Sequence, residues 1–442
     1  MSILIKNVEY LIKKHNQIEK NVDILIEGAF ISKIASSIKT PVGVEIIDAK
    51  GKIVAPGFIN SHTHLYQNLL KGKNDRLSLT NWTNDVIFPL GQTIMTKLDN
   101  KEAKRLTYLW SLLAGIEAIK SGTTCILDMD LRHIGVMRGW IDLGLRGVCA
   151  RTCVDKWVPQ GLVEKPADQY TKIEKLIKKW HQTPTGEPLV SVFLGPSAIF
   201  TCSETLLKWV VETAEKYDTG IQIHVSETEW EVGHIKKEFG LRPVEYLDKL
   251  GFLSPRVSLV HCVHLNEREI SLIAESGAKV VYCPKSNMKL GSGTAPVIKM
   301  MQQNIPVALG TDGAASNDLL DMFEEMRVAA LLQKVRHEDA SVIGGDDVFN
   351  MATANGAVVC RTDSGLIAEG KLADLQLINL NQAHLTPHHD IVNMLVYCAR
   401  ANDVETVIIN GEIVMKERII KNINENEVLR EVNAMRKCYE PA

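Results

Sequence analysis

Residues 52–67 read KIVAPGFINSHTHLYQ, an apolar run that ends in two histidines one residue apart. The apolar, β-branched part predicts a β-strand. Residues i and i+2 at the end of a strand project to the same side, so His62 and His64 would converge on one metal ion. The alternative is that both are polar residues of a surface loop. The rest of the chain must therefore supply further ligands if this is a metal site.

Seven further apolar runs follow the first one, and segments of helical periodicity separate them. The eight runs are Lys52–Asn60, Thr123–Met129, Arg146–Arg151, Leu189–Leu194, Gly220–Val225, Val257–Val263, Ala278–Cys283 and Ile305–Gly310. The predicted helices are Lys101–Lys120, Gln169–His181, Ser203–Lys216, Arg268–Ser276 and Ala295–Gln303. Eight strand-helix repeats are typical of a (β/α)8 TIM-type barrel, an α/β fold, although a doubly wound open sheet has a similar local pattern.

The two ends of the chain contain short strands in place of this alternation. The first fifty residues include SILIKNVEYLI, DILIEG and FISKIA, and LADLQLINL and TVIINGEIVM follow residue 365. Neither end can bury a sheet face alone, so we expect both to form one small β-sandwich domain. The predicted division is residues 1–55 and 365–442 for the two parts of the β-sandwich, and residues 56–364 for the barrel.

The composition excludes several classes of protein. The 442 residues are 45% hydrophobic and 23% charged, with a formal net charge of -3, which is ordinary for a globular protein. Nothing in this balance indicates a nucleic-acid or membrane partner. No apolar segment approaches the roughly 20 residues of a membrane helix, and the nine cysteines contain no C-x-x-C pair. We expect a cytoplasmic protein with reduced thiols.

Ionisable residues end several of the predicted strands. Barrel enzymes place their chemistry at the carboxyl ends of strands, so these residues would share one pocket. The first, fifth, sixth and eighth runs end in or near His62, His64, His224, Glu227, His261 and Asp312.

Each of these residues also has an ordinary structural interpretation. His224 could be a core histidine, and His264 could replace His261 as the functional imidazole. Asp312 could cap a helix or hold a turn, and Glu227 lies in an acidic, solvated segment. All six residues would lie at one end of one barrel, and this shared position favours a functional site.

The chain resembles the amidohydrolase superfamily, in the branch that holds cytosine, guanine and S-adenosylhomocysteine deaminases and the s-triazine hydrolases. The resemblance spans essentially the whole chain. It rests on PGFINSHTHLYQNLLKG, SGTTCILDM, IHVSETEWEV, LVHCVHLNEREISLIAESGAKVVYCPKSNMKLGSGTAPV, ALGTDGAASNDLLDMFEEMR and GLIAEGKLADLQLINL. It implies that His62, His64, His224 and Asp312 bind one divalent metal, usually Zn²⁺, with Fe²⁺ as the alternative. It also implies that Glu227, His261 and Asp312 are catalytic.

The implied chemistry suits these residue types. Three neutral imidazoles and one carboxylate suit zinc with an open position for water, whose pKa coordination lowers from 15.7 toward about 7. Asp312 would accept the water proton, Glu227 would carry a proton to a ring nitrogen and the leaving group, and His261 would orient the attacking oxygen. Dinuclear relatives carry a lysine after strand four, but VSVFLGPSA has none, which favours a single metal.

The substrate pocket is less defined by the sequence. Gln67 stands where relatives use an amide to meet a ring atom, and Trp82 stands where related deaminases enclose the substrate. Adenosine-type deaminases carry a glutamate two residues before that tryptophan, whereas Thr80 stands here, which counts against a nucleoside. Further pocket candidates are Arg151, Asn287 and Lys289.

The leading functional hypothesis is a metal-dependent hydrolase that removes an exocyclic amino group from an aromatic N-heterocycle, such as a purine, pterin, pyrimidine or adenosine-type base. One alternative is displacement of chloride or an alkylamine from an s-triazine. Another is a non-catalytic scaffold, which the six retained polar residues disfavour. The expected partner is a small heterocyclic substrate, and relatives are commonly homodimers.

Overall fold

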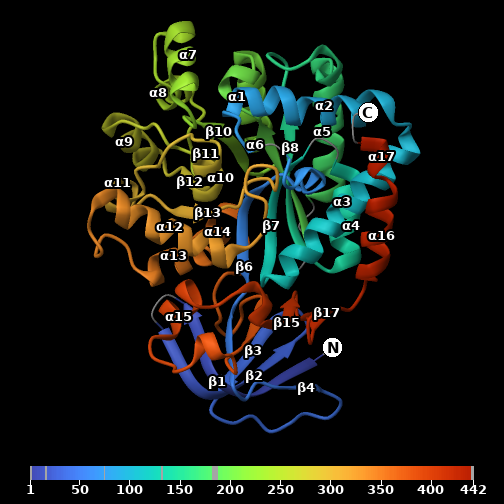
Figure 1. Ribbon diagram of the computed structural model, residues 1–442, viewed down its shortest axis with the longest axis vertical. Helices are drawn as coiled ribbons and strands as arrows, with labels where there is room; N and C mark the ends of the chain where they lie inside the picture. Colours follow the sequence, from blue (N-terminus) through green and yellow to red (C-terminus); the bar gives the residue numbers. More distant parts are fainter. Residues whose placement is uncertain (1, 15–16, 74, 131–132, 182–187, 440–442) are drawn as a thin grey trace.

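The computed structural model describes residues 2–14, 17–73, 75–130, 133–181 and 188–439. Its strands form two sheets, a parallel sheet curved into a near-closed barrel and a mixed sheet that lies beside one end of the barrel (Figure 1). The predicted barrel and the small β-domain built from both chain ends are therefore confirmed. Within the described part of the chain, every helix is too short or too polar to cross a bilayer.

Eight parallel strands form the barrel, and they follow one another in the sheet in chain order. The strands are β6 (Phe58–Thr63), β7 (Thr123–Asp130), β8 (Arg146–Cys153), β9 (Val190–Pro196), β10 (Ile221–Val225), β11 (Val257–His261), β12 (Lys279–Tyr282) and β13 (Val307–Leu309). Buried apolar side chains from most of these strands, among them Leu127, Val148 and Val281, form one packed cluster. The barrel interior is thus a packed core, so a ligand-binding cavity can form only at an end of the barrel.

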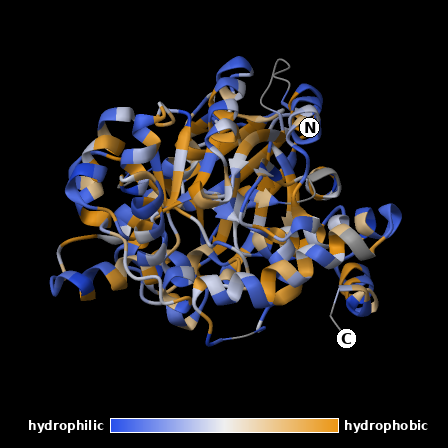
Figure 2. Cartoon of the chain, turned by 90° about the horizontal axis from the view of Figure 1, so that it is seen from above, coloured by the Kyte–Doolittle hydropathy of each residue, from blue (hydrophilic) through white to orange (hydrophobic). Residues whose placement is uncertain are grey.

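Helices connect the strands around the barrel, and Figure 2 shows the hydrophobic strands gathered inside a ring of helices whose outer faces are hydrophilic. The connecting helices are η1 (Leu65–Leu70), α1 (Leu79–Trp82), η2 (Thr83–Ile87), α2 (Phe88–Gln92), η3 (Thr93–Lys97), α3 (Asn100–Lys120), α4 (His133–Leu143), η4 (Gln160–Leu162), α5 (Pro166–Trp180), η5 (Ile199–Thr201), α6 (Glu204–Lys216), α7 (Glu229–Phe239), α8 (Pro243–Lys249), α9 (Glu267–Ser276), α10 (Pro284–Lys289), α11 (Val297–Gln302), α12 (Met322–His337), α13 (Gly345–Met351) and α14 (Ala354–Cys360). Helix α3 begins at a capping box in which the Asp99 side chain accepts from the Glu102 amide and the Glu102 side chain accepts from the Asp99 amide.

The first and last barrel strands meet at a hydrogen-bonded seam. The Asp312 amide donates to the His62 carbonyl at 3.0 Å. The Asn60 side chain donates to Thr311 Oγ1 at 2.7 Å and accepts from the Thr311 amide at 3.0 Å. Thr63 Oγ1 donates to the Asp312 carbonyl at 2.9 Å. Closure of the barrel therefore holds His62 and Asp312 together.

The mixed sheet combines strands from both ends of the chain in the order β17-β16-β15-β14-β5-β1-β2-β3, with β4 paired to β1. Its strands are β1 (Ser2–Lys14), β2 (Gln17–Glu27), β3 (Phe30–Ala35), β4 (Glu45–Asp48), β5 (Lys52–Pro56), β14 (Leu375–Asn379), β15 (Val404–Ile409), β16 (Glu412–Lys416) and β17 (Ile419–Ile420). The two chain ends join where β5 pairs with β1 in parallel and with β14 in antiparallel register. The predicted hairpin turn at Asn410 and Gly411 links β15 to β16, with φ of 54° and 73°.

The prediction of one strand over Lys52–Asn60 is wrong. The structure divides this run at Gly57 into β5, which belongs to the mixed sheet, and β6, which belongs to the barrel. A Cβ at Gly57 would lie 2.0 Å from Thr124 Cγ2, so only glycine fits where the chain crosses between the sheets. Both halves are equally apolar, and hydrophobic periodicity alone cannot assign them to different sheets.

The segment after β14 also contacts the barrel. Its helices are η6 (Ala383–Leu385), α15 (Ile391–Tyr397), η7 (Ala401–Asp403), α16 (Glu425–Ala434) and α17 (Arg436–Tyr439). Lys120 of α3 pairs with Glu425 of α16 at 2.7 Å, and Arg105 of α3 pairs with Glu431. Helix α16 therefore lies along the barrel, as Figure 1 shows.

Candidate active site

The six ionisable residues predicted from the strand ends lie together at one end of the barrel. His62 belongs to β6, and His64 directly precedes η1. His224 belongs to β10 and His261 is the last residue of β11. The remaining two, Glu227 and Asp312, follow β10 and β13.

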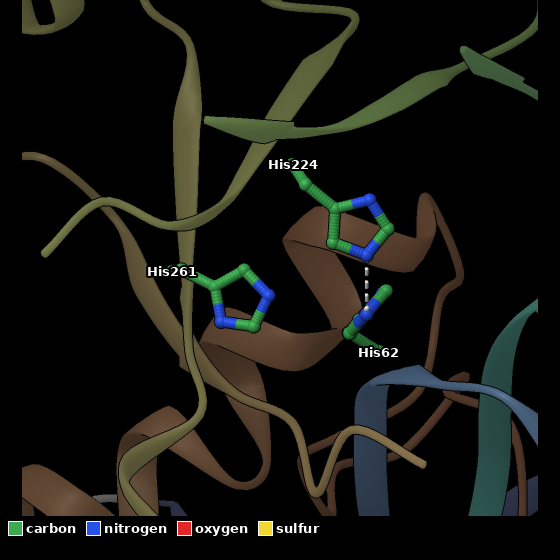
Figure 3. Close-up of side chains that lie close together, drawn as sticks. All are labelled: His62, His224 and His261. Carbon is green, nitrogen blue, oxygen red and sulfur yellow. Dashed lines mark hydrogen bonds between the residues drawn. The ribbon is translucent and has the colours of Figure 1, made fainter. Parts of the chain in front are cut away.

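Four of these side chains converge on one point. His224 Nε2 lies 3.2 Å from His62 Nε2 and 3.3 Å from His64 Nε2. Asp312 Oδ1 lies 3.5 Å from the Nε2 atoms of both His62 and His64. The rings of His62, His224 and a fourth histidine, His261, face one another in Figure 3. His62, His224 and His261 form one group that could hold a metal ion, and His62, His64 and Asp312 form another.

The other ring nitrogen of each convergent histidine contacts an acceptor. His62 Nδ1 lies 2.7 Å from Gln222 Oε1, His64 Nδ1 lies 2.7 Å from the Met129 carbonyl, and His224 Nδ1 lies 2.6 Å from the Ser197 carbonyl. Each acceptor requires the proton on Nδ1, so each Nε2 presents a lone pair. Three lone pairs and a carboxylate oxygen at 3.2–3.5 Å would repel one another without a cation between them. The donor set therefore fits a divalent metal.

His261 has the opposite arrangement. Asn287 Nδ2 donates to His261 Nδ1 at 3.0 Å, which leaves the ring proton on Nε2. That Nε2 lies 3.5 Å from Glu227 Oε2. His261 thus faces the cluster as a hydrogen-bond donor, and Glu227 is its neighbour.

Asp312 and Glu227 are each held by further hydrogen bonds. Asp312 Oδ2 accepts from Ser286 Oγ at 2.5 Å and from Ser316 Oγ at 3.1 Å. Ser292 Oγ donates to Glu227 Oε1 at 3.2 Å. These contacts leave Asp312 Oδ1 directed to the histidines and Glu227 Oε2 directed to His261.

The backbone is unusual at the strand ends that carry the site. His261 has φ of 73° and Asp312 has φ of 61°, in the left-handed region that non-glycine residues rarely occupy. Ser226, beside Glu227, has φ of 52°. Such conformations persist where the surrounding structure enforces them, and they gather at functional sites.

Burial keeps the imidazoles neutral. It lowers the pKa of His64 to about 4 and that of His261 to about 3, and the nearby His62 imidazole contributes to both shifts. Burial and the neighbouring imidazoles also hold the pKa of His224 well below its ordinary value. Neutral imidazoles are the form that binds metals.

The surroundings shift the pKa values of Glu227 and Asp312 in opposite directions. Burial raises the pKa of Glu227 well above its ordinary value, and the negative charges of Asp312 and Glu231 add to the effect. Burial would also raise the pKa of Asp312, but the contacts of its carboxylate with the His62 and His64 imidazoles hold it well below its ordinary value. These opposite shifts favour a carboxylate at Asp312 and a proton on Glu227, a pairing suited to acid-base chemistry.

A cavity of about 1160 Å³, counted out to the open solvent, lies above the cluster. Gln67, Trp82 and Thr80 all line it, together with the cluster residues His64, His224, Glu227, His261 and Asp312. Gln67 is buried, and the buried Trp82 indole nitrogen has no hydrogen-bond partner among the described residues. Two sequence-predicted substrate residues thus lie at the cavity.

The structure does not bring the other pocket candidates to this cavity. Arg151 is buried and does not line this cavity, and its guanidinium pairs with Glu164 at 2.9 Å. Lys289 pairs with Asp318 at 2.5 Å. Asn287 contacts His261, and His264 Nε2 contacts the Ser292 carbonyl.

Sequence reasoning missed the residues that support the site. Gln222 precedes His224 by two residues in the same strand, so the i, i+2 rule that paired His62 with His64 could have found it. The Glu231 carboxylate accepts from the Ser226 and Glu227 amides at 2.9 and 2.8 Å, and an acidic residue in the first turn of a helix is a usable signal. No comparable sequence pattern marks Ser286 and Ser316, the two serines that donate to Asp312.

The sequence is similar to a known protein family and to characterised relatives. The amidohydrolase family profile matches residues 53–414. A 5′-deoxyadenosine deaminase of Methanothermobacter thermautotrophicus is 41% identical over 406 residues, which are 92% of this chain and 92% of that protein. A 5-methylthioadenosine/S-adenosylhomocysteine deaminase of Thermococcus sibiricus is 42% identical over 416 residues, 94% of each chain.

A solved structure shares the whole fold. It is a zinc-bound adenosine deaminase from Xanthomonas campestris, which superposes with a TM-score of 0.90 at 26% identity. The match covers 99% of this chain and 98% of that one.

Proposed function

The chain belongs to the amidohydrolase family, and on this premise we propose that it hydrolyses the exocyclic amino group of an adenosine-type base and releases ammonia. The observation that carries the proposal is the convergence of three imidazole nitrogens and the Asp312 carboxylate beside the buried Glu227, whose pKa burial raises. The deaminases at 41% and 42% identity favour a nucleoside, and they outweigh the presence of Thr80. With this machinery retained, a non-catalytic scaffold is not supported.

We assign His62, His64, His224 and Asp312 as the ligands of one zinc ion. Neutral imidazoles with a carboxylate are a donor set that zinc prefers, and the Xanthomonas protein of the same fold binds zinc. When bound, such an ion lowers the pKa of water toward about 7 and polarises the group it contacts. At the end of β9 the chain has Ser197, which favours one ion over two.

The chain's own groups would then move the protons. The attacking water adds its oxygen to C6 of the base and gives one proton to Asp312, while Glu227 gives its proton to ring nitrogen N1. The C6–N bond breaks as the amino group takes the proton held by Asp312 and leaves as ammonia. Glu227 recovers a proton from the new hydroxyl, which becomes the carbonyl of the product. Each such transfer contributes roughly 10²- to 10⁴-fold.

Two further groups would orient the reaction. His261 Nε2–H would donate to the oxygen as negative charge develops on it. The Gln67 amide would meet the base at the cavity floor, and Trp82 would cover it.

An ammonia-release screen tests the proposal. Adenosine and its 5′-deoxy and 5′-methylthio derivatives would be compared with guanine, pterins, cytosine and aminotriazines, and chloride release from a chlorotriazine would be followed in parallel. We expect the adenosine derivatives to be the best substrates, with activity absent from Asp312→Ala. Turnover of only a free base, a pterin or a triazine would contradict the proposal.

A further inference from the structure

A buried carboxyl group that the deamination chemistry does not use lies outside the cavity. Glu325 belongs to α12 and is fully buried. Its Oε2 accepts from Asn317 Nδ2 at 2.8 Å, and its Oε1 accepts from the Lys285 amide at 3.2 Å. None of Glu325, Asn317 and Lys285 lines the cavity. Because acidic side chains are almost never fully buried unless they are paired, these two contacts are what hold Glu325 in the interior.

The first contact holds the segment that follows β13. Asn317 Nδ2 donates to the Thr311 carbonyl at 2.7 Å as well as to Glu325. That carbonyl belongs to the peptide bond between Thr311 and Asp312, and its orientation is coupled to φ of Asp312, which is 61°. A φ of this kind persists where neighbouring contacts enforce it. Glu325 thus acts through Asn317 on the peptide that precedes Asp312.

The second contact holds the start of α10. Lys285 is the second residue of this helix, and amides of the first turn have no carbonyl partner within a helix. The Glu325 carboxyl group supplies that partner. Ser286 and Asn287 follow directly in the chain, so the placement of their side chains depends on where this turn lies.

These two side chains contact the site itself. Ser286 Oγ donates to Asp312 Oδ2 at 2.5 Å, and Asn287 Nδ2 donates to His261 Nδ1 at 3.0 Å. One side chain outside the cavity, that of Glu325, therefore joins the segment that carries Asp312 to the helix that orients both Asp312 and His261.

We propose that Glu325 is a positioning residue, which sets the place of Asp312 relative to His261 by joining α10 to the segment after β13. This inference rests on the proposed function for the roles of those two residues. Glu325 acts on groups that transform the substrate and not on the cavity walls, so its loss lowers kcat and leaves KM unchanged. A misplacement of about 1 Å can cost roughly 100-fold in rate.

Glu325→Met and Glu325→Gln test the proposal in the zinc-loaded protein. Methionine removes both acceptors, whereas glutamine keeps the shape and one acceptor but turns an amide NH₂ group toward Asn317 or Lys285. We expect kcat for ammonia release from the best nucleoside to fall roughly 10- to 100-fold in Glu325→Met, with KM unchanged and Glu325→Gln intermediate. Zinc affinity, measured by competition with a chromophoric chelator, should fall roughly 10-fold because Asp312 is a proposed ligand.

Asn317→Ala tests the route of the effect. It removes the link between Glu325 and the Thr311 carbonyl, so it should lower kcat without changing KM. Two residues that act through one contact are not additive, and the double variant with Glu325→Met should lose less than the two single variants together. Fully additive losses would overturn the inference.

Two variants serve as controls. Glu324→Gln makes the same charge change on the same helix, but Glu324 contacts only the Lys285 ammonium at 2.5 Å, so kcat should not change. Asp374→Asn alters a buried carboxylate that pairs with Arg146 at 2.7 Å, where β8 begins at the opposite end of the barrel. We expect Asp374→Asn to lower the Tm without lowering kcat. An equal loss of kcat in Asp374→Asn and Glu325→Met would overturn the positioning role.

The remaining outcomes separate this inference from the proposed function. Wild-type kcat and zinc affinity in both Glu325 variants would overturn the positioning role alone. Absence of ammonia release from every nucleoside by the wild type would overturn the proposed function. In that case an unchanged zinc affinity in Glu325→Met would also overturn the positioning role, and a lowered affinity would support it.

Discussion

At the scale of single residues, the four site histidines differ in what their Nδ1 atoms contact. Three Nδ1 atoms contact oxygen acceptors, and that of His261 accepts from Asn287. Residue type alone could not separate these roles, because each histidine ends a similar apolar run. The hydrogen-bond partner decides whether an imidazole presents a lone pair or a proton.

Gln222 should therefore control metal affinity without contacting the metal. Gln222→Met keeps the length of the side chain and removes the acceptor for His62 Nδ1. Loss of such an outer partner weakens metal binding by roughly 10- to 100-fold. Competition with a chromophoric chelator measures this affinity. An unchanged affinity would contradict the role assigned to Gln222.

Glu227→Gln should separate chemistry from metal binding. The variant keeps the shape of the Glu227 side chain, but it cannot transfer a proton. We expect full metal content with kcat lower by roughly 10²- to 10⁴-fold. Elemental analysis and initial rates measure both, and the exposed Glu229→Gln is the matched control. A variant that loses its metal would identify Glu227 as a ligand instead.

At the scale of elements, the seam between β6 and β13 supports both the fold and the site. Thr311→Val removes the acceptor of Asn60 Nδ2 and leaves that buried amide unsatisfied. We expect the free energy of unfolding to fall by about 1–3 kcal/mol. Urea titration at constant metal content measures the change.

Thr123→Val is the control for that variant. Thr123 Oγ1 is buried and has no hydrogen-bond partner among the described residues, so removing it costs no hydrogen bond. A loss of stability as large in Thr123→Val as in Thr311→Val would show that burial of a valine, and not the seam, is responsible.

Strand β12 begins at a lysine whose protonation opposes folding. Burial, with the positive charges of Arg361 and Arg256, lowers the pKa of Lys279 to about 8. Between pH 8 and the ordinary lysine pKa of 10.5 the unfolded chain binds more protons than the folded protein, so this group adds stability as pH rises. Below pH 8 Lys279 is protonated in both the folded and the unfolded protein, so its full destabilising effect on the fold is present.

Lys279→Gln should remove this pH dependence. From pH 7 to pH 10.5, the stability of the wild type relative to the variant should rise by about 1 kcal/mol, reduced from the full shift because the side chain is partly solvated. Denaturant unfolding across pH measures the difference. The exposed Lys237→Gln is the matched control. A difference for Lys279→Gln that does not vary with pH would contradict the prediction.

At the scale of the whole molecule, the metal should stabilise the fold as well as support catalysis. Its four proposed ligands come from both ends of the barrel sheet and from β10, so only the folded chain brings them together. A ligand present at 100 times its Kd stabilises the folded state by about 2.7 kcal/mol. Chelation should lower the Tm, and added zinc should restore both the Tm and the activity.

His62→Ala is the control for chelation. Its Tm should not respond to the chelator, because the ligand set is incomplete. A wild-type Tm that is indifferent to chelator and to zinc would contradict the proposed metal site.

The predictable part of the fold rests on local patterns. The runs from Thr123 to Gly310 each became a barrel strand, because apolar, β-branched runs of this length bury both faces of a parallel sheet. The helix predicted over Lys101–Lys120 became α3, from Asn100 to Lys120. The error at Lys52–Asn60 arose because β5 and β6 have the same apolar pattern and differ only in their distant partners.

The sequence by itself determined the order of strands and helices and placed His62, His64, His224, Glu227, His261 and Asp312 at strand ends. Tertiary structure alone decided the ring proton of each histidine, the pairing of Arg151 with Glu164 and the packing of Trp157 against Phe200 and Trp230. The reason is physical: periodicity and turn chemistry act over a few residues, whereas the His62–Gln222 contact joins positions 160 residues apart. Such contacts follow from the closure of the barrel, and a local stretch of sequence does not record them.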